Sequence, residues 1–337
     1  MNGPRVTIRD VAHAAGASMA SVSKALNDGY GVSAAMREKV LQAAADLGYR
    51  PNPAARAMRG RSHTVGIVAD IGAPIVAQIT EGVQEGLDGS SLDIVLAPAG
   101  NTPERQRHSI DAMLDRNVDG LILVVPTVPY AVLDAFGQAT PTVVIGRHGG
   151  GRHFDSVMDD DAAGAGLAVE HLADLGHRRI SHIAMPMGRL RRPSVLPQTA
   201  REDGYVASMR AHGLEPHILT TDYSEEGGHA GALAALGSES PPTAIFAGTD
   251  TAALGVLRAA HELGLRVPQD LSVIGADNLP VGALPQISLT TIDPAGKLNG
   301  STSAKLLRER IDGRRNPVTY AISPSMVVRS TTAPPRE

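Results

Sequence analysis

The sequence predicts a small all-α head with a helix-turn-helix, followed by an α/β two-lobed body with parallel sheets. Residues 6–47 carry three short amphipathic helical patterns, whereas from residue 63 short apolar stretches alternate with helical ones. Residues 1–61 hold nine Lys/Arg and four Asp/Glu, a net charge of +5, and the remainder carries −9. A basic head on an acidic body indicates that the head meets a polyanion such as nucleic acid.

Length and composition exclude several classes of protein. A chain of 337 residues with 42% hydrophobic residues is globular and suggests two or three domains. No apolar run approaches the roughly 18 residues that a membrane span needs, and the N-terminus lacks a secretory pattern. The absence of cysteine excludes disulfides, a thiol nucleophile and a thiolate metal site. We expect a cytoplasmic, nucleoid-associated protein.

The first helix of the head is bounded by two clear signals. Thr7 and Asp10 stand at capping-box spacing, and Gly16 stops the helix. The apolar residues between them share one helical face, namely Ile8, Val11, Ala12 and Ala15.

The second and third helices complete a helix-turn-helix. Ser18 is placed to cap the second helix and Ser33 to cap the third, which is expected over Ala34 to Leu47. The predicted inward residues are Val22, Ala25 and Leu26 in the second helix and Val40, Leu41, Ala44 and Leu47 in the third. A generic three-helix bundle is the alternative. The outward face of the second helix favours DNA binding, because its small and hydroxyl side chains and one lysine suit a major groove.

The motifs VTIRDVAHAAG, SVSKALN, REKVLQAAADLGYRPN and ARAMR resemble the DNA-binding head and hinge of the lactose-repressor (LacI/GalR) family. The resemblance implies a helix-turn-helix domain over residues 1–50 whose second helix enters the major groove. It places Met19, Ala20 and Lys24 at the bases, and Thr7, Ser18, Ser21, Ser23 and Asn27 mostly near the DNA backbone.

The segment PNPAARAMRG, residues 51–60, has strong helical signals but is too short to be stable alone. The resemblance implies that residues 51–61 are a hinge helix, which folds when two copies meet in the minor groove. Ala55, Met58 and Arg59 would then lie at the DNA, with Met58 where the family usually has a leucine wedge. The alternative is that Met58 only packs against its dimer mate.

The body contains nine apolar stretches that we predict as strands: HTVGIVAD, LDIVLAPA, GLILVVP, PTVVIGR, DSVMDD, ISHIAMP, PHILTTD, TAIFAGT and LSVIGAD. Ligands of parallel sheets bind at the carboxyl ends of the strands. The polar and aromatic residues at those ends and at one helix start are Asp70, Asp160, Arg201, Tyr223, Asp250 and Asp277. Taken singly, each aspartate has the alternative of merely capping a helix; together these residues predict a cleft for a small polar molecule.

The family resemblance continues through LAVEHLADLGHRRI, PPTAIFAGTD, LSVIGADN and LTTID. It implies a periplasmic-binding-protein-like sensor over residues 62–337, with three crossovers and the effector in the cleft between lobes. The first lobe would comprise about 62–161 and 293–322, and the second about 162–292 and 323–333.

Departures from the family pattern bear on the effector. Residues 73–76 read APIV where the family often has N-P-F-F, and aromatic residues make up only 3% of the chain. A sugar or sugar derivative is the expected effector. The arginine-rich stretch 188–201 would admit an anionic metabolite instead, unless it is a solvated loop.

The predicted function is that of a repressor that binds a palindromic operator as a homodimer and is released by its effector. A corepressor-dependent regulator and a solute-binding protein without DNA function are the alternatives. No nucleotide-binding or hydrolase motif is present, so we expect no enzyme, no catalytic residue and no cofactor. We also expect no metal, because His171, His177 and His182 do not share one face. The absence of an apolar heptad tail favours a dimer over a tetramer.

Overall fold

A computed structural model describes residues 6–26, 30–49, 62–100, 102–186 and 196–336. The chain divides into two compact units, Met1–Ser62 and His63–Glu337. In the described part of the chain, no helix combines the length and apolarity that crossing a membrane requires.

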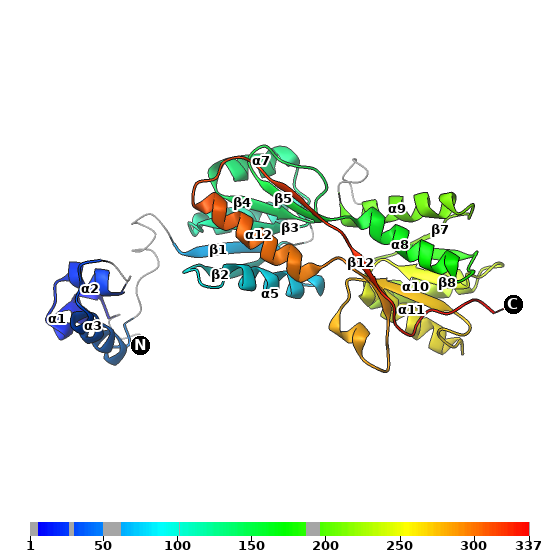
Figure 1. The fold of residues 1–337 in the computed structure, drawn as a ribbon, viewed down its shortest axis with the longest axis horizontal. Helices are drawn as coiled ribbons and strands as arrows, with labels where there is room; N and C mark the ends of the chain where they lie inside the picture. Colours follow the sequence, from blue (N-terminus) through cyan, green and yellow to red (C-terminus); the bar gives the residue numbers. More distant parts are fainter. Residues whose placement is uncertain (1–5, 27–29, 50–61, 101, 187–195, 337) are drawn as a thin grey trace. The chain divides into compact units, whose positions relative to one another are not determined.

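The head consists of α1 (Ile8–Ala15), α2 (Met19–Leu26) and α3 (Ala34–Asp46) (Figure 1). The predicted capping box is confirmed, because the Asp10 carboxylate accepts the backbone N–H and the hydroxyl of Thr7, both at 2.7 Å. Gly16 ends α1 in the left-handed region with φ 61°. Ser18 begins α2 by accepting the N–H of Ser21 at 3.1 Å.

One apolar core joins the three helices of the head. Its fully buried centre is formed by Val11, Val22 and Val40, with alanines from each helix around them. The prediction that Leu41 and Leu47 point inward is wrong: they are 49% and 38% exposed. Leu41 is rotated by about 100° from the buried Val40, and Leu47 lies beyond the last residue of α3. The inward face of α3 is completed by alanines instead.

The first sheet of the body has six parallel strands in the order β11-β5-β4-β3-β1-β2. These strands are β1 (Thr64–Ala69), β2 (Asp93–Pro98), β3 (Gly120–Val124), β4 (Thr142–Ile145), β5 (Asp155–Asp159) and β11 (Thr319–Ile322). Alternate side chains face opposite layers: Ile122 packs under α5 (Ile75–Leu87) and α12 (Gly296–Ile311). Its neighbours Leu121 and Leu123 pack under α6 (Pro103–Asp115) and α7 (Tyr130–Ala139).

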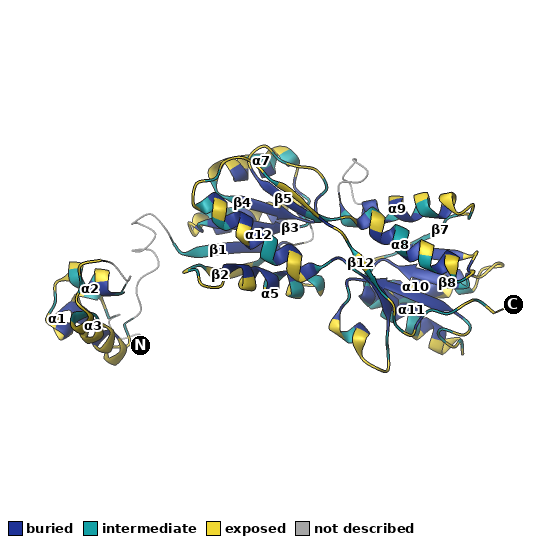
Figure 2. Ribbon diagram, in the orientation of Figure 1, coloured by how far each residue is buried: buried dark blue, intermediate teal, exposed yellow. Residues whose placement is uncertain are grey.

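The second sheet has the order β12-β10-β9-β8-β6-β7, with β12 antiparallel to β10. Its strands are β6 (Ile180–Ala184), β7 (His217–Thr220), β8 (Ala244–Ala247), β9 (Ser272–Ala276), β10 (Thr290–Asp293) and β12 (Ser325–Val327). One face packs on α8 (Asp161–Asp174) and α9 (Pro197–Ala211). The other packs on α10 (Glu225–Leu236) and α11 (Asp250–Glu262). The inner strands of both sheets are buried, the edge strands β2, β7, β11 and β12 are largely half-buried or exposed, and the helices expose their outer faces (Figure 2).

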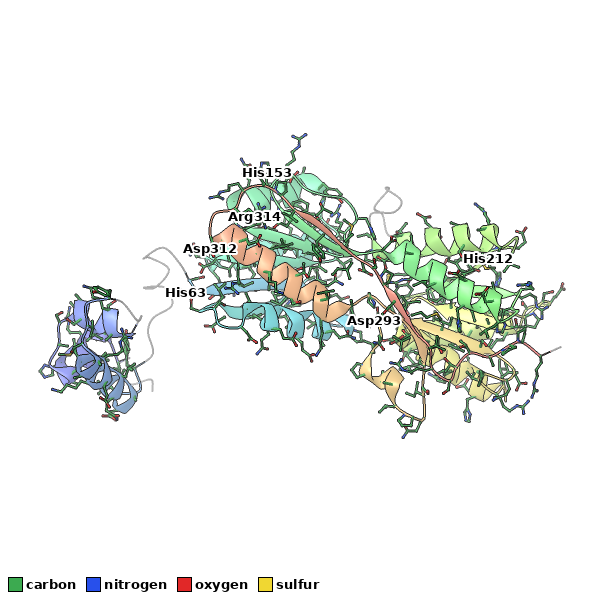
Figure 3. The ribbon with its side chains drawn as sticks, viewed as in Figure 1. His63, His153, His212, Asp293, Asp312 and Arg314 are labelled. Atoms are coloured by element: carbon green, nitrogen blue, oxygen red, sulfur yellow. The ribbon has the colours of Figure 1, made fainter. Side chains whose placement is uncertain are left out.

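The chain passes between the two sheets three times, after β5, after β10 and after β11. Asp293, at the end of β10, marks the second passage (Figure 3). Helix α12 and strand β11 follow β10 of the second sheet in sequence. Even so, β11 is a strand of the first sheet and α12 packs on that sheet. The residues after β5 and after β9 contact side chains of the first lobe, namely His148 and Gln78.

Candidate DNA-binding face and ligand site

The outward face of α2 is made of small, hydroxyl and basic side chains. Met19 is 49% exposed, and Ala20 and Lys24 are exposed, whereas Val22 and Ala25 are buried. The sequence of α2, MASVSKAL, contains no acidic residue. A helix with this face can approach a negatively charged groove without charge repulsion.

The other predicted DNA contacts are distributed around the ends of the head helices. Thr7 is the N-cap of α1 and Ser18 precedes α2, both exposed, while Ser21 and Ser23 are half-buried on α2. Asn27, Ala55, Met58 and Arg59 lie outside the described residues. The DNA role of all these positions stays a prediction.

In the body, Arg201 on α9 is buried and both of its terminal nitrogens are engaged. Its Nη2 donates to Asp161 Oδ1 at 2.7 Å, and its Nη1 donates to the carbonyl of Gly248. The second oxygen of Asp161 lies 3.1 Å from His148 Nε2. Because His148 follows β4 of the first lobe and Asp161 begins α8 of the second, this contact bridges the lobes.

The electrostatics of this bridge favour the charged imidazole. The hydrogen bond to Asp161 raises the pKa of His148 more than its burial lowers it. The charges of Asp159 and Asp160 raise the pKa of His148 further.

The three consecutive aspartates after β5 have different environments. Asp160, the predicted ligand, is exposed and its carboxylate accepts the N–H of Ala163 at 2.9 Å, as a helix cap. Asp161, only 3% exposed, holds Arg201. Burial, and after it the charge of Asp161, raise the pKa of Asp159 to about 7. Asp159, Asp161 and His148 were not predicted. The run of three aspartates at a strand end was a signal for the first two, and the sequence held none for His148.

Asp250 and Asp277 are both buried at the carboxyl edge of the second sheet. Asp250 accepts the hydroxyl of Thr291 at 2.5 Å and the N–H of Leu279 at 2.7 Å. Burial raises its pKa to about 6. Asp277 has the unusual φ of 113°, and burial raises its pKa well above the ordinary value, while Arg201 lowers it.

Tyr223 and Asp70 differ in how close they come to Arg201. The Tyr223 ring centroid lies 6.0 Å from Arg201 Cζ. The ring fits against Gly248, where a Cβ would come within 2.3 Å of it. Asp70 is exposed in the first lobe, and its carboxylate accepts the N–H of Gly72 at 3.0 Å.

The structure therefore brings Arg201, Tyr223 and Asp277 together, with Asp250 beside them, and directs Asp70 and Asp160 to backbone groups of their own loops. Asp159, Asp161 and Arg201 also line a small cavity with room for about one water molecule. A second contact between lobes comes from Gln78 of α5, whose Nε2 donates to the carbonyls of Asp277 and Asn278 at 3.1 and 3.3 Å. A ligand at this edge would touch groups from both lobes.

Two protein-family models match the chain. Residues 7–52 match the model described as bacterial regulatory proteins, lacI family, and residues 169–332 match the periplasmic binding protein-like domain. The first match covers the helices of the head, and the second covers most of the second lobe together with α12 and β11.

Similar proteins align over nearly the whole chain. The chain is 31% identical over 329 residues to the ribose operon repressor of Halalkalibacterium halodurans, with 97% of each chain covered. It is 32% identical over 336 residues to the HTH-type transcriptional repressor PurR of Erwinia tasmaniensis, again with 97% of each covered. A crystal structure of the lac repressor dimer bound to operator and the anti-inducer ONPF has a TM-score of 0.83 at 28% identity, covering 98% of this chain and 99% of that chain. The chain belongs to the lacI family of bacterial regulatory proteins and is a DNA-binding transcription regulator rather than an enzyme.

Proposed function

We propose that the chain represses transcription by binding a two-fold symmetric operator as a homodimer. The observation that carries this proposal is the exposed, acid-free face of α2 on a basic head. Met19, Ala20 and Lys24 face the bases, and residues 51–61 form the hinge between head and body. The similarity to a lac repressor dimer bound to operator, over 98% of this chain, supports the same mode of binding.

The first lobe offers a surface that suits self-association. Strand β2 is the edge of its sheet, and Val95 and Leu96 on it are 39% and 42% exposed. An exposed apolar edge strand is a hazard unless another chain covers it. A second copy related by a two-fold axis would cover this surface and bring two heads to two half-sites.

The proposed switch is a small polar effector held at the interlobe site by Arg201, Tyr223 and Asp277. Binding there closes one lobe on the other and changes the angle between the two first lobes of the dimer. This movement displaces the hinges and lowers operator affinity. A coupling of about 1–3 kcal/mol is typical of two-site systems, which corresponds to a several-fold to hundredfold change.

Selection of operators from a pool of random duplexes tests the DNA function of the full chain. We expect a two-fold symmetric consensus. We expect Lys24→Ala to weaken the affinity of the full chain for the selected operator by roughly 5- to 100-fold, measured by fluorescence anisotropy at fixed salt. The matched control is Lys305→Ala, an exposed lysine on α12 of the body, which leaves the affinity unchanged. Recovery of no symmetric consensus, or equal effects of the two substitutions, contradicts the proposal.

A further inference from the structure

A second pocket lies in the second lobe, at the amino ends of the parallel strands β6, β8 and β9. Arg179, Thr243 and Asp270 precede these strands and line this amino-end pocket. Its volume is about 460 Å³, within the roughly 300–1,000 Å³ that small-molecule sites commonly have. The strands are four or five residues long, so the pocket and the interlobe site lie at opposite edges of the sheet, roughly 13–17 Å apart.

The C-terminal tail completes the pocket. Pro335 and Arg336 line it, and the tail runs along the side of the second lobe that faces away from the first lobe (Figure 1). Residues of both lobes surround the interlobe site, whereas every residue that lines the amino-end pocket belongs to the second lobe or to its tail. The two sites can therefore be occupied independently.

Leucines and prolines form most of the wall of this pocket. They come from the ends of α10 and α11 and from the turns before β8 and β9. Leu263 is 50% exposed, so an apolar ligand would remove part of its side chain from water. The apolar wall comprises Leu236, Leu263, Leu265, Pro241, Pro242 and Pro268.

Arg179 adds a positive charge to this apolar wall. Its Nε donates to the carbonyl of Pro241 at 2.8 Å, and no Asp or Glu forms an ion pair with it in the described part of the chain. The hydrogen bond holds the guanidinium beside the pocket and leaves both of its Nη groups available to a ligand. Asp270, by contrast, already has Arg266 and Arg336 as partners, at 2.8 and 2.6 Å.

The available groups of the pocket favour an anion over a cation. An ammonium group would find Asp270 occupied, and the caps of α10 and α11 donate N–H groups to the last carbonyls of those helices. A carboxylate would accept two parallel hydrogen bonds from the Nη groups of Arg179, which is the geometry that arginine favours.

We propose that the amino-end pocket binds a small monocarboxylate that carries an apolar ring. The carboxylate binds Arg179, and the ring packs on Leu263 and Leu265. This ligand is a second one, in addition to the effector at the interlobe site, and its binding does not depend on the proposed repressor activity.

A series of naphthyl compounds tests the proposal on the full chain. Naphthylacetate carries the ring and the carboxylate, naphthylacetamide replaces the charge with a neutral amide, and naphthylethylamine replaces it with a cation. Acetate carries the carboxylate without the ring. Because the chain contains no tryptophan, the fluorescence of the naphthyl group reports the bound fraction after equilibrium dialysis without overlap from indole.

We expect one molecule of naphthylacetate to bind per chain with a Kd of about 0.1–1 mM. The amide is expected to bind at least about tenfold more weakly, because it cannot form charge-assisted hydrogen bonds with Arg179. The amine should not bind measurably, and a large excess of acetate should not displace naphthylacetate.

Matched variants assign the binding to the pocket. Arg179→Met keeps the length of the side chain and removes the charge, so it should weaken naphthylacetate binding by at least about tenfold. Its control is Arg178→Met, because the neighbouring Arg178 donates to the Ala173 and His177 carbonyls and does not line the pocket. This control should retain the parent affinity.

A second pair of variants tests the apolar wall. Leu263→Ala should weaken naphthylacetate binding by about threefold or more, because it removes apolar surface that the ring covers. Leu233→Ala is the control, because Leu233 is an exposed leucine of α10 that lies outside the pocket. It should leave the affinity unchanged.

Should a variant fail to fold, NMR places the ligand on the unchanged chain. We expect nuclear Overhauser contacts from the naphthyl protons to the methyl groups of Leu263 and Leu265. Contacts to Leu279 instead would place the ligand at the interlobe edge, because Leu279 donates its N–H to Asp250 there, and would overturn the proposal.

The remaining outcomes decide the chemistry of the ligand. Equal binding of naphthylacetate and naphthylacetamide would mean that a carboxylate of the chain itself, such as that of Glu337, already pairs with Arg179, and it overturns the proposal. Tighter binding of the amine, or displacement by acetate, overturns it as well. Failure of naphthylacetate to bind, or equal losses in the variants and their controls, overturns the site. None of these results bears on operator selection.

Discussion

Burial disfavours the ionised form of the Asp250 side chain. The side chain is fully buried, and burial raises its pKa to about 6 although Thr291 and Leu279 donate to it. A carboxyl with a raised pKa binds its proton more tightly in the folded state. The free energy of unfolding therefore falls as the pH rises from 3.8, the pKa of this carboxyl in the unfolded chain, to about 6, its pKa in the folded chain. Above that pH the loss is complete.

Asp250→Asn removes this dependence while keeping an oxygen for Leu279 and an amide donor for Thr291. The free energy of unfolding of the variant, relative to the parent, is expected to increase by about 1 kcal/mol between pH 5 and pH 7. Urea unfolding at the two pH values measures it. The control Asp111→Asn lies on the surface of the first lobe and gives a constant difference. A constant difference for Asp250→Asn as well would show that the buried carboxyl does not titrate in this range.

At the same scale, the sequence could locate the candidate ligand site only to within a residue. Polar residues at strand ends predicted that Arg201, Tyr223, Asp250 and Asp277 would gather at one edge of the second sheet, and whether a ligand binds there stays a prediction. They could not separate Asp160 from Asp161, because which of them turns inward depends on where α8 begins. Asp160 has the capping position, so the next residue faces Arg201. His148 was not predictable at all, since its partner is in the other lobe.

At the scale of elements, the turn between α1 and α2 depends on Gly16. Its φ of 61° lies in the left-handed region, and no atom lies within 4 Å of the position a Cβ would occupy. Gly16→Ala therefore costs only backbone strain, about 1–2 kcal/mol. Hydrogen exchange of α1 and α2 amides in the full chain is expected to accelerate by roughly 5- to 30-fold.

Gly166 is the matched control for this substitution. It lies within α8, has no left-handed φ and likewise has no atom within 4 Å of a Cβ. Gly166→Ala is expected to slow exchange in α8, because alanine favours a helix by roughly 0.5–1 kcal/mol. Equal exchange in the Gly16→Ala variant and the parent would mean that the turn does not require a left-handed residue.

Capping signals predicted the helices of the head better than apolar patterns did. Thr7 with Asp10, Ser18 and Ser33 each begin a helix where predicted. The inward stripe of α3 was wrong because its alanines, not Leu41 and Leu47, face the small core. A sequence with many alanines gives a weak apolar stripe, and tertiary packing then decides which face is buried.

At the scale of the whole molecule, the alternation of strands and helices predicted parallel sheets, but it did not predict which strands belong to which sheet. The pattern gives no reason for α12 and β11 to join the first sheet after the ten strands β1 to β10. That arrangement depends on pairing between segments far apart in sequence, such as β11 with β5. Its consequence is functional, because three chain passages connect the lobes and limit how they move against each other.

The contact between His148 and Asp161 is the part of this connection that depends on pH. The hydrogen bond to Asp161 raises the pKa of His148, so the bridge is fully formed below the ordinary value of 6.5 and is lost as the pH rises through the higher folded value. Asp159, Asp160 and Asp161 face the imidazole, and Arg201 shares Asp161 with it.

We therefore expect the lobes to separate more often at pH 8 than at pH 6. Hydrogen exchange at the three crossovers, corrected for its intrinsic pH dependence, should show a protection that falls by a few-fold over this range, since a partly buried ion pair contributes on the order of 1 kcal/mol. His148→Gln removes the titrating group and should give low protection at both values. The matched control is His153→Gln, whose partner Asp134 at 3.8 Å lies in the same lobe. If the crossover amides exchange equally fast in the His148→Gln and His153→Gln variants at pH 6, the contact between His148 and Asp161 does not hold the lobes together.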